Sequence, residues 1–239
     1  MTKHIFRILE VGCGKGRNAY FLSKKKNVVV VGIDVVAENV VEARKTFLGV
    51  EFLQMSVEQL AFPDASFDKV YALDVLEHVD NLTLSVSEIV RVLKLKGKLI
   101  VNVPAAKSEE WLLRLRPSYH REIHHVRIFR GSELVNTLAV YGLRQQRCKA
   151  TAFLDHMLLY YLFTRSKISA SQLGVGDWRG SVVGRIVFAL HAYTKFDLVF
   201  QSWLKFVPIW VISLPLAWVV NSVGNRFFPK SMYYKFIKE

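Results

Sequence analysis

The chain has 239 residues, of which 51% are hydrophobic, and only two cysteines, Cys13 and Cys148. This length fits one large domain, or one domain with an elaboration, and can bury a sizeable core. The cysteine count excludes a disulfide framework and indicates a reducing compartment. The first residues lead almost directly into an apolar run, so we expect no signal peptide.

The positive charge of the chain is concentrated in its second half. Residues 1–110 carry 15 Lys/Arg and 14 Asp/Glu, a net charge of +1, whereas residues 111–239 carry 18 and 6, a net charge of +12. A basic region can face nucleic acid, anionic lipid or an acidic substrate. Because the same half is rich in Trp, Phe, Tyr and Leu, the composition favours a membrane surface over nucleic acid.

A strand, a glycine-rich turn and a helix are predicted for residues 8–22, which read ILEVGCGKGRNAYFL. Gly12, Gly14 and Gly16 allow positive φ angles and let a ligand approach closely, because glycine has no Cβ. The turn is shorter than the GxGxxG of dinucleotide-binding proteins, and Glu10 just before it suits a ligand with an ammonium group. Buried carboxylates are seldom left unpaired, so Glu10 predicts a partner network around that group.

The rest of the first half alternates between strands and helices. Strands are predicted at 26–34, 51–55, 67–73 and 98–103, and helices at 37–48 and 81–92. Gly97 is expected to make the turn into the last of these strands. Repeated βα units predict a parallel, doubly wound sheet, which binds its ligand outside the carboxyl ends of the strands. Asp34 ends the second strand, and Ser56 and Asp74 follow the third and fourth strands, so all three fall at those ends.

In the second half of the chain the alternation of predicted strands and helices is less regular. A short helix is predicted at 132–141, a strand at 143–148 and a final strand at 231–238, with a long apolar region between these two strands. If the two strands are neighbours in one sheet, the residues between them form an insertion whose ends are tied to the same body. Such an insertion cannot cross a bilayer once and stay across.

The first 105 residues resemble the class I S-adenosylmethionine-dependent methyltransferases of the small-molecule type, such as the quinone and lipid O-methyltransferases. The motifs that carry the resemblance are LEVGCGKG, VVGID, FPDASFDKVYALDVLEHVDN at 62–81 and IVRVLKLKGKLIVNVP at 89–104. The resemblance implies an α/β, Rossmann-like, doubly wound sheet of seven strands, mostly parallel with the last strand antiparallel. We therefore expect a methyltransferase domain at 1–150, an apolar helical insertion at 151–229 and the final strand at 230–239.

The resemblance also implies S-adenosyl-L-methionine as the cofactor. Its expected binding residues are Glu10, Gly12, Cys13, Gly14, Gly16, Asp34, Val35, Ser56, Val57, Leu73 and Asp74. Asp34 would accept hydrogen bonds from the ribose hydroxyls, because an ionised carboxylate is an acceptor and not a donor. The alternative interpretation is that Asp34 is solvated and caps the next helix. Many relatives have Asp where Ser56 stands, so a hydrogen bond to the adenine is expected to be weak or absent.

Two histidines are candidate catalytic residues. His78 follows Glu77 in DVLEH, and His125 lies in HHVRIFRGSEL, where His124 and Arg127 are candidate substrate-side residues. A positioned His can accept a proton near neutral pH. Two alternatives stay open: His78 supports its loop, or in-line positioning alone is enough for methyl transfer. No metal site is expected.

The longest uncharged stretch, Phe206–Val220, has 15 residues. It is shorter than the ~20 residues of a spanning helix, and Pro208 and Pro215 would kink it. Tryptophans and flanking basic residues suit an interfacial position. Two interpretations stay open: monotopic or peripheral association with the cytoplasmic face of a membrane, or a helical cap over an apolar substrate pocket in a soluble cytoplasmic enzyme.

The sequence therefore predicts an enzyme that transfers a methyl group to oxygen of a lipophilic or lipid-linked small molecule, near a membrane surface. One alternative is an inactive cofactor-binding or scaffold protein of the same fold. The other, a nucleic-acid methyltransferase, is disfavoured because DVLE at 74–77 stands where an NPPY-like tetrad would be. No nucleic-acid partner is therefore expected.

Overall fold

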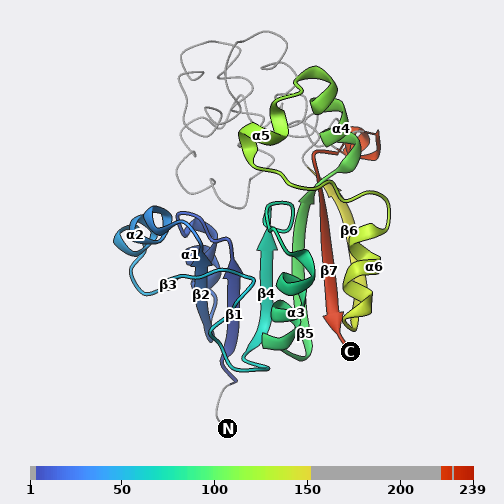
Figure 1. Cartoon of the computed structure of the whole chain (residues 1–239). Helices are drawn as coiled ribbons and strands as arrows, with labels where there is room; N and C mark the ends of the chain where they lie inside the picture. The colour runs from blue at the N-terminus through green and yellow to red at the C-terminus, as the bar shows by residue number, and fades with distance from the viewer. Residues whose placement is uncertain (1–3, 152–221, 228) are drawn as a thin grey trace, which may run out of the picture. The chain divides into compact units, whose positions relative to one another are not determined.

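The computed structural model describes residues 4–151, 222–227 and 229–239, which form an α/β fold (Figure 1). Most of the predicted insertion, including the stretch 206–220, lies outside the described residues, so its predicted helical structure stays a prediction. None of the helices that the structure describes is long and apolar enough to cross a bilayer.

Seven strands form one sheet in the order β3-β2-β1-β4-β5-β7-β6. The strands are β1 Phe6–Val11, β2 Val28–Asp34, β3 Glu51–Gln54, β4 Phe67–Leu73, β5 Leu93–Pro104, β6 Leu143–Thr151 and β7 Ser231–Lys238. The pairs β1–β2, β1–β4, β2–β3 and β4–β5 are parallel. The buried valines and isoleucines of β1 and β2 suit strands that are covered on both faces.

The last strand runs against its neighbours, as its arrow in Figure 1 shows. The backbone N–H of Glu239, after the end of β7, donates to the Gly142 carbonyl before β6. At the other end, the N–H of Lys230 donates to the Thr151 carbonyl. These bonds pair opposite ends of β6 and β7, so the predicted mixed sheet with an antiparallel last strand is confirmed, and the two strands are neighbours.

The labelled helices are α1 Arg17–Ser23, α2 Ala37–Thr46, α3 Leu82–Val92, α4 Ala106–Leu115, α5 Tyr119–Ile123 and α6 Glu133–Val140, and residues 222–227 are also helical. Helix α3 begins as the sequence predicts, because the side chain of Asn81 accepts a hydrogen bond from the Leu84 N–H at 3.0 Å. At its other end, the Lys238 ammonium donates to the carbonyls of Val90 and Leu93, both at 2.8 Å. Helix α3 is therefore fixed to the last strand.

The described chain forms two compact units. Among the described residues, the first unit consists of 4–103, 129–149 and 233–239, and the second of 104–128, 150–151, 222–227 and 229–232. The first unit contains α1, α2, α3, α6 and most of the sheet, and the second contains α4 and α5. The predicted domain boundaries at 150 and 229 stay a prediction.

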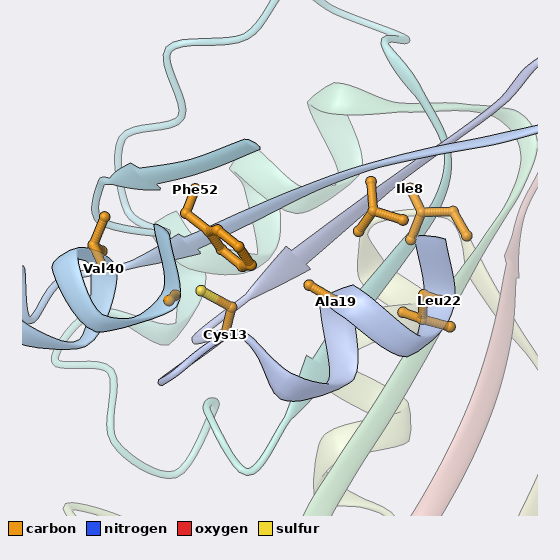
Figure 2. Packing of buried hydrophobic residues seen from close by; sticks show 8 residues of the cluster. Ile8, Cys13, Ala19, Leu22, Val40 and Phe52 are labelled. Carbon is orange, nitrogen blue, oxygen red and sulfur yellow. The ribbon is translucent and has the colours of Figure 1, made fainter. Parts of the chain in front are cut away.

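A cluster of small and aromatic side chains packs α1 and α2 against the sheet (Figure 2). The ring of Phe52 from β3 lies beside Cys13, and Ala19 and Leu22 face Ile8 from α1. A Cβ on Gly16 would stand 2.5 Å from the Phe52 ring, and φ at Gly16 is +79°. Gly16 is therefore required both by the turn and by the core beneath it.

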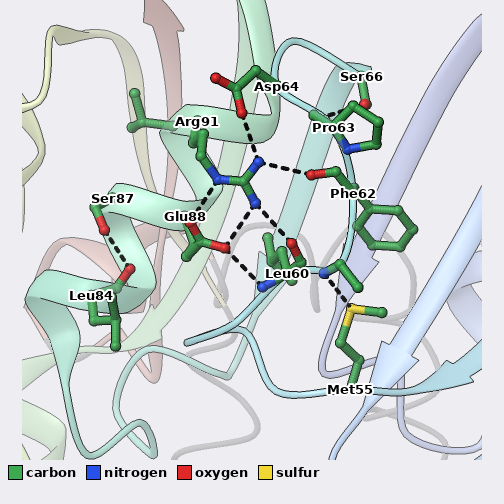
Figure 3. A network of polar contacts seen from close by, with 12 residues as sticks. Met55, Leu60, Phe62, Pro63, Asp64, Ser66, Leu84, Ser87, Glu88 and Arg91 are labelled. Carbon is green, nitrogen blue, oxygen red and sulfur yellow. Dashed lines mark hydrogen bonds and ion pairs between the residues drawn. The ribbon is translucent and has the colours of Figure 1, made fainter.

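The segment between β3 and β4 is held by Arg91 of α3 (Figure 3). Its guanidinium donates to the carbonyls of Leu60 at 2.7 Å and Phe62 at 2.8 Å. It also pairs with both oxygens of Glu88 and with Asp64. One side chain thus fixes the chain that leads from the end of β3 into β4.

Two parts of the fold differ from the sequence prediction. Strand β5 begins at Leu93 rather than at residue 98, and the positive φ of 59° falls on Lys96 rather than on Gly97. Gly97 is needed for a different reason, because its Cβ would stand 2.6 Å from the Lys94 carbonyl oxygen. The stretch between β5 and the predicted helix at 132–141 contains two helices, α4 and α5, that the sequence pattern did not predict.

Candidate functional site

The glycine turn after β1 has the backbone geometry that the sequence predicts. The φ angles are +64° at Gly12, +52° at Gly14 and +79° at Gly16. A Cβ on Gly12 would stand 2.4 Å from Cγ2 of Val75, so the turn packs against the residue that follows the end of β4. A Cβ on Gly14 would have no atom of the described chain within 4 Å, so the turn has an open side there.

Glu10 is buried at the end of β1, with 3% of its surface exposed. Its Oε1 accepts a hydrogen bond from the Asn18 side chain at 2.7 Å, whereas Oε2 has no partner in the described part of the chain. Burial raises the pKa of this carboxyl to about 7, although the hydrogen bonds from Asn18 and the Ala19 N–H oppose the shift. A buried carboxylate oxygen without a partner is costly, which indicates a site for a cationic ligand group.

Asp34 joins the end of β2 to the glycine turn. Its Oδ2 accepts a hydrogen bond from the Gly14 N–H at 2.7 Å. Its Oδ1 accepts one from the N–H of Val36, the N-cap residue of α2, at 2.9 Å, and one from the Asn39 side chain at 3.4 Å. Asp34 therefore shapes the turn and also braces the start of α2. A carboxylate has about four acceptor positions, so a bond from a ribose hydroxyl stays a prediction that this geometry allows.

The other expected cofactor residues also follow strand ends. Val35 is 61% exposed just after β2, and Val57 is buried after β3. Ser56 is exposed, and its Oγ accepts a hydrogen bond from the Glu58 N–H at 3.1 Å. Ser56 also lines a shallow surface depression of about 530 Å³, together with Glu58, Gln59, Leu84 and Glu88.

Leu73 and Asp74 mark the end of β4. Asp74 has a φ of 56°, and its Oδ1 accepts a hydrogen bond from the Asn102 side chain at 2.6 Å. Its N–H donates to the Asn102 carbonyl at 3.0 Å, which ties the end of β4 to β5. The structure thus brings the predicted residues after β1, β2, β3 and β4 to one edge of the sheet, while their contacts with a cofactor stay predictions.

The side chain of Cys13, an expected cofactor residue, lies in the core. It is 8% exposed and packs with Ala19, Val40 and Phe52 (Figure 2). Burial, together with the nearby carboxylates of Glu10 and Asp34, raises the pKa of its thiol to about 12. Any contact between Cys13 and a cofactor would therefore come from its backbone.

The candidate histidines belong to different units. His78 is exposed in the turn after β4, and its N–H donates to the Val75 carbonyl at 2.9 Å. His124, His125 and Arg127 belong to the second unit. There His125 lies against Glu109, with Nδ1 at 2.7 Å from Oε2 of that carboxylate. The predicted catalytic and substrate-side roles of these residues stay predictions.

Sequence reasoning missed Glu109 and His120. The Nε2 atom of His120 lies 2.8 Å from the same Oε2 of Glu109 that contacts His125. No short motif links these three residues, because they stand 11 and 16 positions apart and are brought together by α4 and α5. The only signal in the sequence is the density of histidines between residues 120 and 125.

Comparisons with known proteins place a methyltransferase domain in the first half of the chain. Residues 9–101 match the family model described as "Methyltransferase domain". An O-methyltransferase of Aspergillus nomiae is 35% identical over 101 residues, which cover 40% of this chain and 45% of the relative. A probable S-adenosylmethionine-dependent methyltransferase of Mycobacterium tuberculosis is 36% identical over 98 residues, covering 41% of this chain and 35% of the relative. The chain thus matches less than half the length of these relatives.

The fold is also found among solved structures. The crystal structure of a putative sarcosine dimethylglycine methyltransferase from Galdieria sulphuraria has a TM-score of 0.61 to this chain. The likeness covers 99% of this chain and 80% of that one, and at 16% identity it concerns the fold alone. The matching family model, the named relatives and the mixed seven-stranded sheet together identify residues 9–101 as a class I S-adenosylmethionine-dependent methyltransferase domain.

Proposed function

We propose that this protein transfers the methyl group of S-adenosyl-L-methionine to an oxygen atom of a lipophilic or lipid-linked acceptor at a membrane surface. The observation that carries the methyl-transfer part is the buried Oε2 of Glu10, which has no partner in the described chain and lies at the end of β1. The ammonium group of the cofactor's methionine portion is a suitable partner for that oxygen.

The residues around the glycine turn fit this cofactor in three ways. Glu10 offers a carboxylate oxygen to a cation, and Gly14 leaves open space where any other residue would have a side chain. Asp34 holds the turn and retains acceptor capacity for ribose hydroxyls. When bound, the cofactor supplies a methyl group on a positively charged sulfur. The residues of this chain would bind it and hold the acceptor in line with that methyl group.

The acceptor and its location are inferred from the relatives and the sequence. The relative from Aspergillus nomiae is named an O-methyltransferase, which supports oxygen as the acceptor atom. Residues 111–239 have a net charge of +12 and contain the uncharged stretch 206–220, which supports an apolar acceptor and an anionic membrane surface. In this proposal His78 or His125 takes the proton of the acceptor hydroxyl.

A transfer assay with tritium-labelled cofactor tests this function. We expect the full chain, supplied with anionic lipid vesicles that contain a total lipid extract, to move label into the organic phase. A water-soluble catechol and a mixture of cellular RNA should receive little label. Cofactor binding without transfer to any of these acceptors would instead support the scaffold alternative, and label in RNA would support a nucleic-acid methyltransferase.

The affinity for the cofactor should rise with pH through about 7 because of Glu10. Below its raised pKa the carboxyl is neutral and cannot pair with an ammonium group, so affinity should fall by up to about tenfold per pH unit. Calorimetric titrations between pH 5.5 and 8 would measure this slope. The matched variant Glu10→Gln should bind weakly with a flat profile, and a wild-type profile equally flat would contradict this role of Glu10.

The stability of the protein without cofactor should change in the opposite direction. The pKa of Glu10 is raised in the folded state, so between about pH 4.5 and 7 the folded state keeps a proton that the unfolded state has lost. This group's contribution to the free energy of unfolding is fully present below pH 4.5 and is lost as pH rises to about 7. The Glu10→Gln variant should lack that contribution to the pH dependence in urea unfolding.

A further inference from the structure

Three side chains in the second unit converge on one point. Glu109 comes from α4, His120 from α5, and His125 from the chain just after α5. The Oε2 atom of Glu109 lies 2.8 Å from Nε2 of His120 and 2.7 Å from Nδ1 of His125. The three atoms lie within 4.8 Å of one another, so two imidazole nitrogens and a carboxylate oxygen share one small volume.

The local fold holds this cluster in place. His124 ends α5 with a φ of 59°, which turns the chain back so that the His125 N–H donates to the His120 carbonyl at 3.0 Å. The connection between α4 and α5 is braced by Glu122, whose Oε1 accepts hydrogen bonds from Arg116 at 2.8 Å and Ser118 at 2.6 Å. The backbone therefore fixes the three side chains relative to one another.

A small apolar core lies beside the cluster. Leu112 and Tyr119 form a buried core with Trp111, Leu113 and Ile123 packed against it. The ring of Tyr119 lies next to both imidazoles, with ring centroids 5.8 Å from His120 and 6.3 Å from His125. Glu109 is only 3% exposed, whereas the side chain of His120 is 19% exposed. The cluster thus has a buried carboxylate, that of Glu109, and one edge, at His120, that solvent reaches.

We propose that Glu109, His120 and His125 bind a divalent transition-metal ion of the zinc class. Two imidazoles and one carboxylate are ligands that zinc takes readily, and three protein ligands leave a position for water or another ligand. Zinc–nitrogen bonds of about 2.0–2.1 Å place the ligand atoms of a tetrahedral site about 3.3 Å apart. The contacts of 2.7 and 2.8 Å would therefore open by about half an ångström while the metal displaces the protons that they share.

The alternative is a hydrogen-bonded cluster that only joins α4 to α5. The two interpretations differ in what happens to His125. A metal-bound His125 is a ligand and not a base, so in the metal-loaded protein the proton-accepting role proposed above would fall to His78. The metal site does not depend on the proposed methyl transfer, because its ligands lie outside the matched methyltransferase domain.

Metal titration of the full chain tests this site. The protein is stripped with EDTA and titrated with Co²⁺, whose visible absorption reports tetrahedral coordination, and Zn²⁺ affinity is measured by competition with a chromophoric chelator. We expect one equivalent of either metal per chain. Both Glu109→Gln and His120→Asn should weaken Zn²⁺ binding by at least about tenfold, since even outer-shell changes weaken metal sites by that much.

A neighbouring histidine provides the matched control. His124→Asn changes an exposed imidazole beside the cluster, and Asn tolerates the left-handed backbone found there. This variant should bind Zn²⁺ as the wild type does. Should Glu109→Gln fail to fold, His120→Asn still decides the question, because its side chain is partly exposed. The proposal is overturned if the stripped protein shows no saturable binding, or if the wild type and both cluster variants bind equally.

Discussion

Asp34→Ala should lower the affinity for S-adenosyl-L-methionine at least about 100-fold. The change removes the expected acceptor of a ribose hydrogen bond, which is worth about 1.5–3 kcal/mol when one partner is charged. It also releases the Gly14 N–H, which Asp34 holds at 2.7 Å, so the turn loses its fixed shape before the cofactor arrives. A loss of about 2.7 kcal/mol corresponds to the expected 100-fold change, and calorimetric titration would measure it directly.

Two further variants separate the charge of Asp34 from the shape of the turn. Asp34→Asn keeps one acceptor oxygen and should bind the cofactor with an affinity between those of wild type and Asp34→Ala. Glu38→Ala removes an exposed acid from the first turn of α2 and should change nothing. If folded Asp34→Ala bound within about threefold of wild type, Asp34 would be a brace for the turn and for α2, without a role at the ribose.

Arg91→Met should lower the free energy of unfolding by about 3 kcal/mol. The guanidinium satisfies the carbonyls of Leu60 and Phe62 and pairs with Glu88 (Figure 3). Glu88 in turn accepts the Leu60 N–H at 2.8 Å, so the variant disturbs several bonds of one network. Hydrogen bonds to charged groups contribute about 1.5–3 kcal/mol each, and water replaces some of them because the Arg91 side chain is 31% exposed. Urea unfolding would measure the loss.

A second arginine tests whether the stability lost in Arg91→Met comes from the hydrogen-bond network of Arg91 or only from the loss of a positive charge. Arg144 pairs with Glu239, and both side chains are well exposed, at 61% and 58%. Such surface pairs contribute little, so Arg144→Met should change the free energy of unfolding by less than about 1 kcal/mol. Equal losses in the two variants would show that Arg91 does not hold the segment between β3 and β4 in the way its contacts indicate.

The parts of the fold that could be predicted are those with strong local signals. The glycine turn, the β-branched run that forms β2, and the Asn81 cap of α3 each follow from a few adjacent residues. Helix α5 has only five residues and depends on Glu122 contacting Arg116 and Ser118, so no periodicity could indicate it. The early start of β5 depends on pairing between Phe67 and Leu93, which are far apart in sequence.

In the candidate site, too, features with a local sequence signal could be predicted and features that depend on tertiary packing could not. The positions of Glu10 and Asp34 beside the glycine turn could be predicted, because each stands at the end of a predicted strand in a parallel sheet. The direction of the Cys13 side chain could not, since the φ angles of the flanking glycines decide which residue of the turn faces the core. Glu109 could not be predicted either, because its partners are supplied by the packing of two helices.

The hydrogen bond from Lys230 to Thr151 has a consequence for how this protein can diverge. The chain leaves the sheet at the end of β6 and returns beside that point at the start of β7. The entropy of closing such a loop grows only with the logarithm of its length, so residues can be added or lost there with little effect on the sheet. Insertions, deletions and substitutions can therefore accumulate in that segment while the glycine turn stays unchanged. Domains of this kind can in this way change their methyl acceptor without changing their cofactor site.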